Sequence, residues 1–192
     1  MNLILPQPSF TADDLLTLPD LERFELVDGK LVEQNMGAVS SYVGVRLSRR
    51  LVEFCDEPFG GWVLAADASY QFLPDRPNTV RKPDVSFIRP GRLPDERLPD
   101  GHIRLAPDLV AEVVSPNDLF YAVEEKIAEY RSGGVRLIWI VVPPTRNVLI
   151  RRLDGSAGEV REDGELSGED VVPGFQVRVG DLYRLPTDAA AP

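Results

Sequence analysis

A carboxylate and an amine occupy unusual positions within one strand–turn–helix segment, residues 108–130. Glu112 lies in the middle of LVAEVV, an apolar run of strand length. Such runs are usually covered on both faces of a sheet, where an unpaired carboxylate is strongly destabilising. Lys126 lies on the apolar stripe of the following helix, between Val123 and Ile127. An acid and an amine that both break the burial pattern, in one short unit, indicate a functional site.

Asp84, in the strand-like segment RKPDVSFI, is the third candidate. Mg²⁺ prefers oxygen ligands and often takes only one or two carboxylates. Asp84 and Glu112 on neighbouring strands could hold Mg²⁺ or Mn²⁺ together with a backbone carbonyl near Val113. A metal held there lowers the pKa of bound water and offsets phosphoryl charge. Lys126 would orient the attacking water or stabilise the developing negative charge, so the chemistry predicted is phosphodiester hydrolysis.

The same residues also allow structural interpretations. The Pro-Asp dipeptide occurs six times in the chain, mostly where a turn is expected, so it carries no weight by itself. A buried Glu112–Lys126 ion pair beside a turn-forming Asp84 would serve a non-catalytic binding or assembly protein. A third possibility is a metal-dependent hydrolase of a small phosphate ester, which would suit an acidic surface.

Composition sets the broad class. The chain has 192 residues, 43% apolar and 27% charged, which predicts one soluble domain over 1–186 and a frayed, disordered tail over 187–192. The single cysteine, Cys55, excludes an internal disulfide framework and favours the cytoplasm. The start MNLILPQPSF has no basic region, so no signal peptide is expected, and no apolar run is long enough for a membrane span.

A net charge of −10 argues against a general polyanion binder. Arginine and lysine groups do occur, at 46–50, 76–82 and 151–152, although mixed-charge surface is their simpler interpretation. The only histidine, His102, lies in the proline-rich segment 89–107 and is expected to be a surface loop residue rather than a metal ligand. That long connection itself is predicted to be functional or mobile.

The elements that must position these residues follow from periodicity, and the pattern predicts a mixed α/β or α+β domain. We expect helices over 10–18, 39–54 and 118–131, the last with the apolar stripe Leu119, Ala122, Val123, Ile127 and Tyr130. A hairpin is expected over 24–34 around Asp28-Gly29. Further strands are expected as two in 62–74, then 81–88, 109–114, 137–142, 148–153 and a short one at 177–179, with a hairpin or loop over 155–169. Strands 109–114 and 137–142 should be parallel because a helix connects them.

Four blocks of the chain form a recognisable set: FELVDGKL, RKPDVSFI, the long block from APDLVAEVVSPND to LIWIVVPP, and VPGFQVRVGDLY. Together they resemble the Uma2 family of restriction endonucleases, formerly a domain of unknown function. The resemblance covers most of the chain in the expected order. It implies the restriction-endonuclease-like fold: a mixed central sheet flanked by helices, with extra N- and C-terminal β-strands.

The resemblance also implies a PD-(D/E)XK-type active site. Asp84 and Glu112 would be the metal ligands, and the catalytic lysine would be Lys126 on the following helix, because Val114 occupies the usual lysine position. Glu25 would be an auxiliary acid, whereas its strand alone predicts a carboxylate facing water. Where many relatives carry a histidine this chain has Ser40-Ser41, so no histidine role is transferred. The implied cofactor is Mg²⁺ or Mn²⁺, the implied substrate DNA, and the expected assembly a homodimer with one site per strand.

Overall fold

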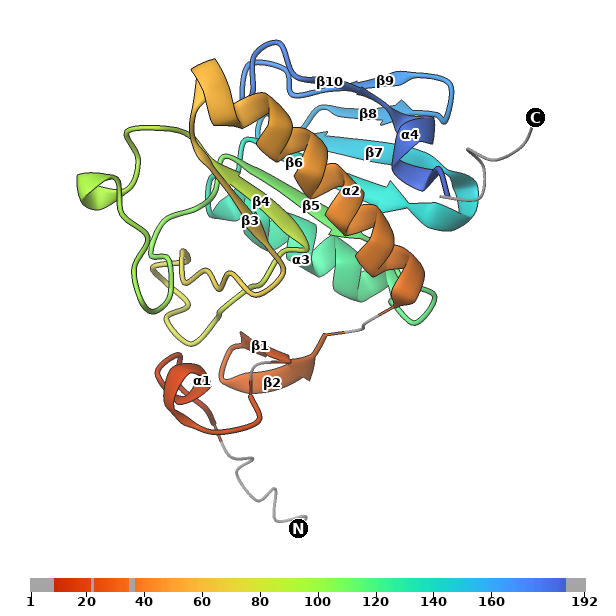
Figure 1. Cartoon of the computed structure of the whole chain (residues 1–192). Helices are drawn as coiled ribbons and strands as arrows, with labels where there is room; N and C mark the ends of the chain where they lie inside the picture. Colours follow the sequence, from red (N-terminus) through yellow and green to blue (C-terminus); the bar gives the residue numbers. More distant parts are fainter. Residues whose placement is uncertain (1–8, 22, 35–36, 186–192) are drawn as a thin grey trace.

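A six-stranded mixed sheet forms the centre of the molecule (Figure 1). The computed structural model describes residues 9–21, 23–34 and 37–185. In spatial order the strands are β3 (Trp62–Ala65), β4 (Val85–Ile88), β5 (Leu109–Val113), β6 (Leu137–Val142), β7 (Asn147–Arg152) and β8 (Ala157–Val160). Only β5 and β6 run parallel, as the connecting helix requires; the other neighbours are antiparallel.

Two helices cover opposite faces of this sheet (Figure 1). On one face α2 (Ala38–Phe54) buries Val43, Leu47 and Leu51, one residue per turn, and continues as the π-helix η1 (Cys55–Phe59). On the other face α3 (Phe120–Ser132) buries Ile127 and Tyr130. Because strand side chains alternate, β5 sends Ala111 to the α2 side and Val110 to the α3 side. Glu112 therefore shares the α3 face.

An N-terminal unit lies beside the sheet and consists of α1 (Asp14–Thr17) and the hairpin of β1 (Phe24–Val27) and β2 (Lys30–Glu33) (Figure 1). Asp28 and Gly29 both have positive φ, 48° and 78°, as a type I′ turn requires. Leu26 is fully buried and bridges to Val80, which anchors the hairpin to the segment before β4.

The C-terminal elements cover the α2 face next to β7 and β8. They are η3 (Pro143–Thr145), β9 (Glu165–Ser167), β10 (Gln176–Arg178) and α4 (Val179–Tyr183). Strands β9 and β10 pair with each other as a separate ribbon, and their apolar residues join the core under α2. The fold class expected from the sequence, a mixed sheet flanked by helices with extra terminal strands, is confirmed.

Several element predictions were wrong in detail. The segment 62–74 forms one strand, because Tyr70 makes only isolated bridges to Arg81 and Ile103. Regular pairing in 81–88 begins only at Val85, after Pro83, which has no N–H to donate. The segment 155–169 is not one hairpin: β8 pairs with β7 and β9 with β10.

Some helix predictions were also wrong at their ends. The helix expected over 10–18 is only the single turn α1. Leu119, expected on the buried stripe of α3, precedes its first turn and is 72% exposed. Val179 begins the short helix α4, which the sequence pattern did not predict.

The proline-rich segment 89–107 contains one 3-10 turn, η2 (Pro94–Glu96), and buries Leu93 and Ile103 in the core under α3. The predicted terminal tail and the apolar start of the chain lie outside the described residues. Within the described part of the chain, no helix is both long and apolar enough to cross a membrane.

Candidate active site

Sheet register brings the two predicted metal ligands together. In the antiparallel pair of β4 and β5, Val85 is opposite Ala111, so the flanking residues Asp84 and Glu112 face each other one step further along. Glu112 lies on the α3 face by alternation, whereas Asp84 precedes β4 and lines hollows on both the α3 and the α2 side of the strand ends. The Asp84 carboxylate accepts a hydrogen bond from the Val113 backbone N–H at 2.7 Å, which fixes it across the strand ends.

Lys126 comes from α3 to the same place. Its ammonium lies 3.3 Å from Glu112 Oε2 and 3.2 Å from Glu25 Oε2. The Lys126 side chain is 21% exposed, because it lines a hollow of about 70 Å³ at the end of the strands. This hollow is lined by Asp84, Glu112, Val113 and Lys126, with Gln34 and Asp118 at its edge. The three residues selected from the sequence therefore meet at one accessible point.

Glu25 also belongs to this cluster, and the interpretation of it as a water-facing carboxylate was wrong. It is 1% exposed, and its Oε1 accepts from the Lys82 backbone N–H at 2.8 Å. Its Oε2 lies 3.0 Å from Arg81 Nη1 as well as near Lys126. The hairpin anchored by Leu26 turns this carboxylate inward, towards the sheet.

Two supporting residues were not identified from the sequence. The Tyr130 hydroxyl donates to Glu112 Oε1 at 2.6 Å, and Tyr130 is fully buried. It lies four residues after Lys126, on the same face of α3, and this spacing was the available signal. Arg81 is 3% exposed and joins Glu25 to Glu129. In sequence it looked like one member of a surface basic group.

Burial and neighbouring charges shift the pKa values of the residues in this cluster. Burial raises the pKa of Glu112 to about 7, opposed by Lys126 and reinforced by the nearby Asp84 and Glu25 carboxylates. Burial also raises the pKa of Asp84 against the hydrogen bond from Val113. Burial alone would lower the pKa of Lys126, but Glu112 and Glu25 outweigh it and raise that pKa. The Lys126 amine thus stays protonated beside the Glu112 and Glu25 carboxylates.

The donor set fits a hard divalent cation. Three residues with carboxylates line the hollow, Asp84 and Glu112 from the strand ends and Asp118 from the turn before α3, and Val113 also lines it. Mg²⁺ commonly takes one or two carboxylates and keeps several waters. Among the described residues no group of three or more His, Cys, Asp or Glu side chains is placed to hold a metal, so a zinc-type site is not indicated.

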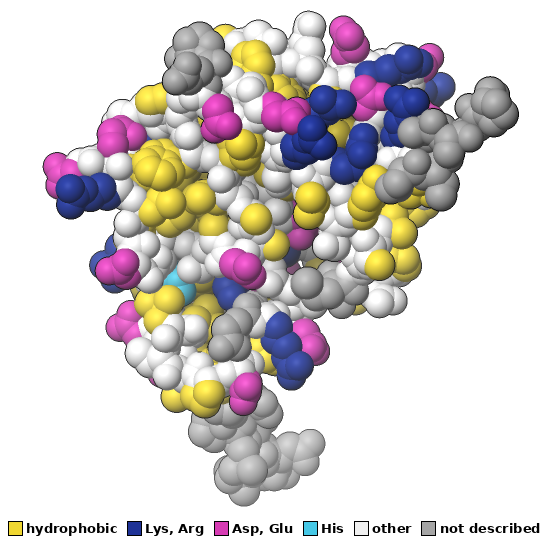
Figure 2. All heavy atoms as spheres, in the orientation of Figure 1, with side chains coloured by type: hydrophobic (Ala, Val, Ile, Leu, Met, Phe, Trp, Pro, Cys, Tyr) yellow, Lys and Arg dark blue, Asp and Glu magenta, His cyan; other side chains and the backbone are white. Residues whose placement is uncertain are grey.

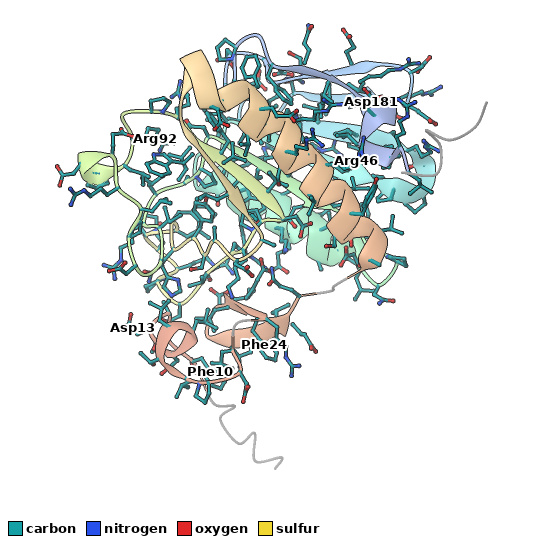
Figure 3. The ribbon with its side chains drawn as sticks, in the orientation of Figure 1. Phe10, Asp13, Phe24, Arg46, Arg92 and Asp181 are labelled. Carbon is teal, nitrogen blue, oxygen red and sulfur yellow. The ribbon has the colours of Figure 1, made fainter. Side chains whose placement is uncertain are left out.

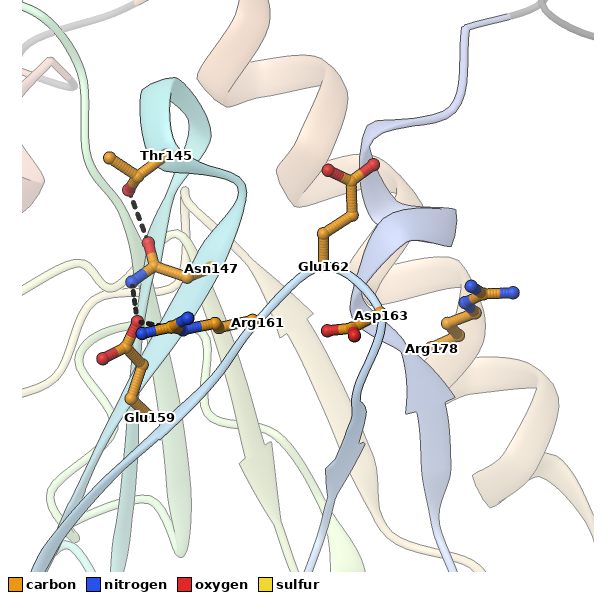
Figure 4. A pocket seen from close by; sticks show the side chains of 7 residues that line it. All are labelled: Thr145, Asn147, Glu159, Arg161, Glu162, Asp163 and Arg178. Atoms are coloured by element: carbon orange, nitrogen blue, oxygen red, sulfur yellow. Dashed lines mark hydrogen bonds and ion pairs between the residues drawn. The ribbon is translucent and has the colours of Figure 1, made fainter.

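A larger hollow of about 690 Å³ lies elsewhere, beside β7, β8 and β10 (Figure 4). Its polar side chains largely bind one another. Asn147 donates to Glu159 at 2.8 Å, and Thr145 donates to Asn147 at 2.5 Å. The acids that line it, Glu159, Glu162 and Asp163, are all exposed. The larger hollow therefore lacks the buried acids that distinguish the candidate active site near Lys126.

The arginines of α2 are partly neutralised. Figure 2 shows basic side chains over the middle of α2 and the C-terminal elements, with acidic ones among them. Arg46 donates to the Asp181 carbonyl at 2.8 Å, as their proximity in Figure 3 indicates. Arg49 pairs with Glu53 at 2.7 Å. The prediction of a mixed-charge surface thus describes this face.

His102 is not a surface residue, contrary to expectation. It is 6% exposed, with Nδ1 2.8 Å from Ser69 Oγ and Nε2 2.8 Å from the Ala12 carbonyl oxygen. It holds the segment before α1 against the long loop. The local sequence could not show this, because Ala12 lies 90 residues away.

Comparison with known proteins shows the family and the fold. A family model, Uma2, described as "Putative restriction endonuclease", matches residues 12–180. A crystal structure of a "putative nuclease belonging to DUF820" from Anabaena variabilis aligns with a TM-score of 0.75 at 20% identity, covering 91% of this chain and 97% of that chain. At that identity the likeness shows the fold. No curated protein matches the chain. The family match spans most of the 192 residues, and the chain belongs to the Uma2 family.

Proposed function

We propose that this protein is a Mg²⁺-dependent endonuclease, also served by Mn²⁺, that hydrolyses DNA phosphodiester bonds at a PD-(D/E)XK-type site. Asp84 and Glu112 are the metal ligands, with the Val113 carbonyl, and Lys126 is the catalytic amine. Glu25 is the auxiliary acid. The observation that carries the proposal is the convergence of two strand-borne acids and a helix-borne amine on one accessible hollow.

Each side chain has a role that its contacts define. Lys126 has three N–H donors, and its two carboxylate neighbours leave one donor for a phosphate oxygen or the attacking water. Because its pKa is raised, Lys126 donates and does not act as a base. Glu25 and Glu112 hold the amine at the edge of the hollow. A bound metal ion would supply an activated water and offset phosphoryl charge.

The size of the hollow argues against an enclosed small-molecule site. At about 70 Å³ it is far below the roughly 300–1,000 Å³ of pockets that enclose drug-sized ligands. A phosphodiester that projects from a polymer can reach into such a hollow while the rest of the substrate stays outside. This favours a nucleic-acid substrate over a small phosphate ester.

The rival interpretation is a structural Glu112–Lys126 pair in a non-catalytic protein. In a core ion pair both partners would be enclosed, whereas the Lys126 side chain is 21% exposed. Lys126 and Glu112 also line the same hollow as Asp84, where a cation and a phosphate can reach them. This access favours the catalytic interpretation.

Because the net charge is −10, electrostatic contact with DNA should be limited. Binding should therefore depend less on salt concentration than it does for basic nucleic-acid binders. We also propose a homodimer, because two sites related by a two-fold axis would address both strands of a duplex. Sedimentation equilibrium measures this directly, and a monomer at working concentration would contradict it.

The test is cleavage of plasmid and single-stranded DNA with Mg²⁺ or Mn²⁺, comparing wild type with Asp84→Ala and Lys126→Ala. Loss of one transition-state donor of this kind lowers kcat by about 10²–10³-fold in comparable sites. Leu166→Ala, in the core under α2, serves as a destabilised control outside the site. Equal cleavage by wild type and both site variants would refute the proposal.

A further inference from the structure

A buried chain of alternating charges leads from the protein surface to the candidate active site. It runs through Asp28, Arg76, Glu129, Arg81 and Glu25, and ends at Lys126. Successive ion-pair distances along it are 2.7, 2.5, 2.5, 3.0 and 3.2 Å. The third to fifth residues of this chain of charges are buried: Glu129 is 4%, Arg81 3% and Glu25 1% exposed. No sequence motif and no step of the proposed chemistry uses Glu129.

We propose that Glu129 is a positioning residue for the active site: it holds Arg81, Arg81 orients Glu25, and Glu25 places the Lys126 amine. The inference rests on the proposed function. Glu129 touches neither Lys126 nor the hollow in any described contact, so its effect must pass through Arg81.

The geometry shows how the effect is transmitted. The Arg81 guanidinium divides its charge between two acids, with Nε on Glu129 and Nη1 on Glu25. Glu25 Oε2 in turn is shared between Arg81 and Lys126. If Glu129 were neutral, the whole guanidinium charge would fall on Glu25, which would weaken its attraction for Lys126. The amine would then shift towards Glu112 and compete with a metal ion there.

Stability alone gives a poor reason for this arrangement. Replacing a buried Glu–Arg–Glu set by apolar residues of similar volume is often neutral or stabilising. Residues that orient catalytic groups and metal ligands, by contrast, are needed for activity, and changing one typically lowers metal affinity or activity by about 10–100-fold. Glu129 and Tyr130 are consecutive residues of α3. Glu129 binds Arg81, and Tyr130 donates a hydrogen bond to Glu112, so neighbouring side chains of one helix hold two groups of the cluster.

The experiment compares wild type, Glu129→Gln and a matched control, Asp108→Asn. Asp108 is 1% exposed and pairs with Arg89 and Arg92, but it lies at the opposite end of β5 from Glu112. For each protein we would measure kcat and KM on single-stranded DNA, the Mn²⁺ dissociation constant by calorimetry, and thermal stability. Both variants should lose thermal stability, because each removes one member of a buried ion pair.

A positioning role predicts that Glu129→Gln lowers kcat by about 10–100-fold with KM nearly unchanged, and weakens Mn²⁺ binding by about 10-fold. Asp108→Asn should keep both. Glu129→Asp retains the charge on a side chain that is one methylene shorter, so it should recover part but not all of kcat. If Glu129→Gln does not fold, this partial loss of kcat in Glu129→Asp is the test.

Three results would overturn the inference. The first is a folded Glu129→Gln variant with wild-type kcat and Mn²⁺ affinity. The second is a Glu129→Asp variant that behaves as wild type when Glu129→Gln does not fold. The third is a wild type that neither binds Mn²⁺ nor cuts DNA, which refutes the proposed function as well. In the first two results the wild type is active, so failure of this inference can be told apart from failure of the proposed function.

Discussion

Glu112→Gln should make the metal-free protein more stable at alkaline pH while abolishing cleavage. The glutamate is buried, and its pKa is raised to about 7 by burial and by the Asp84 and Glu25 carboxylates, in spite of Lys126. Glutamine has nearly the same shape as the protonated acid and carries no charge. It can still bond the Tyr130 hydroxyl. A functional residue is thus predicted to reduce the stability of the fold that contains it.

The magnitude follows from linkage. The folded protein binds a proton on Glu112 more tightly than the unfolded chain does, where the pKa is near the ordinary value of 4.5. The stability contributed by the protonated acid is therefore present in full below pH 4.5 and is lost as the pH rises through about 7. At about 1.4 kcal/mol per pKa unit, the loss is on the order of 3 kcal/mol. Glutamine should avoid that loss.

Urea denaturation at pH 5 and pH 8.5, with and without Mg²⁺, measures the effect. The stability of Glu112→Gln relative to wild type should increase by about 3 kcal/mol between the two pH values, seen as a change in midpoint with a constant slope. Saturating Mg²⁺ should stabilise wild type at pH 8.5, because it binds the folded state, and should have little effect on the variant.

The reasoning fails if Glu112→Gln is less stable than wild type by a similar amount at both pH values. Glu112 would then be one half of a structural ion pair with Lys126, and the acid would be ionised in the fold without difficulty. A stabilising effect of Mg²⁺ that is equal in both proteins would show that the cation binds elsewhere.

Three further predictions concern neighbouring residues. Lys126→Met should destabilise the protein by about 1–3 kcal/mol in urea denaturation at pH 8. This is less than the roughly 3–5 kcal/mol expected when a buried charge is left without any partner, because Glu25 still pairs with Arg81 and Glu112 can take up a proton. An equal loss of stability at pH 5 would contradict this explanation. Tyr130→Phe should weaken Mg²⁺ binding by about 10–100-fold in calorimetry, since Glu112 loses the hydroxyl that orients it, and unchanged affinity would exclude that role. Leu47→Ala, in the core under α2, should cost about 2–5 kcal/mol yet leave Mg²⁺ affinity as in wild type, which controls for loss of stability alone.

The sequence was sufficient for the part of the site that depends on local periodicity. Glu112 in an apolar strand and Lys126 on the apolar stripe of the next helix are fixed by alternation and by the 3.6-residue period. Their meeting follows once a helix connects two parallel strands. Asp84 needed one further fact, the antiparallel register of β4 with β5, which the sequence did not predict; the family resemblance implied only its role as a metal ligand.

Residues placed by long-range packing could not be predicted in this way. The pattern of β1 predicted that Glu25 faces water, as a carboxylate on an edge strand usually does. Its burial depends on Lys82 and Arg81, more than 55 residues further along the chain. His102 was misjudged for the same reason, because its partners Ser69 and Ala12 come from other segments. Leu119 was misplaced because a helix end, unlike a helix face, is poorly defined by period.

The residues predicted from local periodicity and those placed by long-range packing contribute different groups to the candidate site. The sheet and α3 alone supply Asp84, Glu112 and Lys126, two acids and one amine. The N-terminal hairpin adds Glu25, and Glu25 brings Arg81 into contact with the cluster. Arg81 divides its charge between Glu25 and Glu129, so the hairpin carboxylate remains available to Lys126. The hairpin therefore sets the position of the amine, while Asp84 and Glu112 from the sheet line the hollow in which the proposed metal ion would bind.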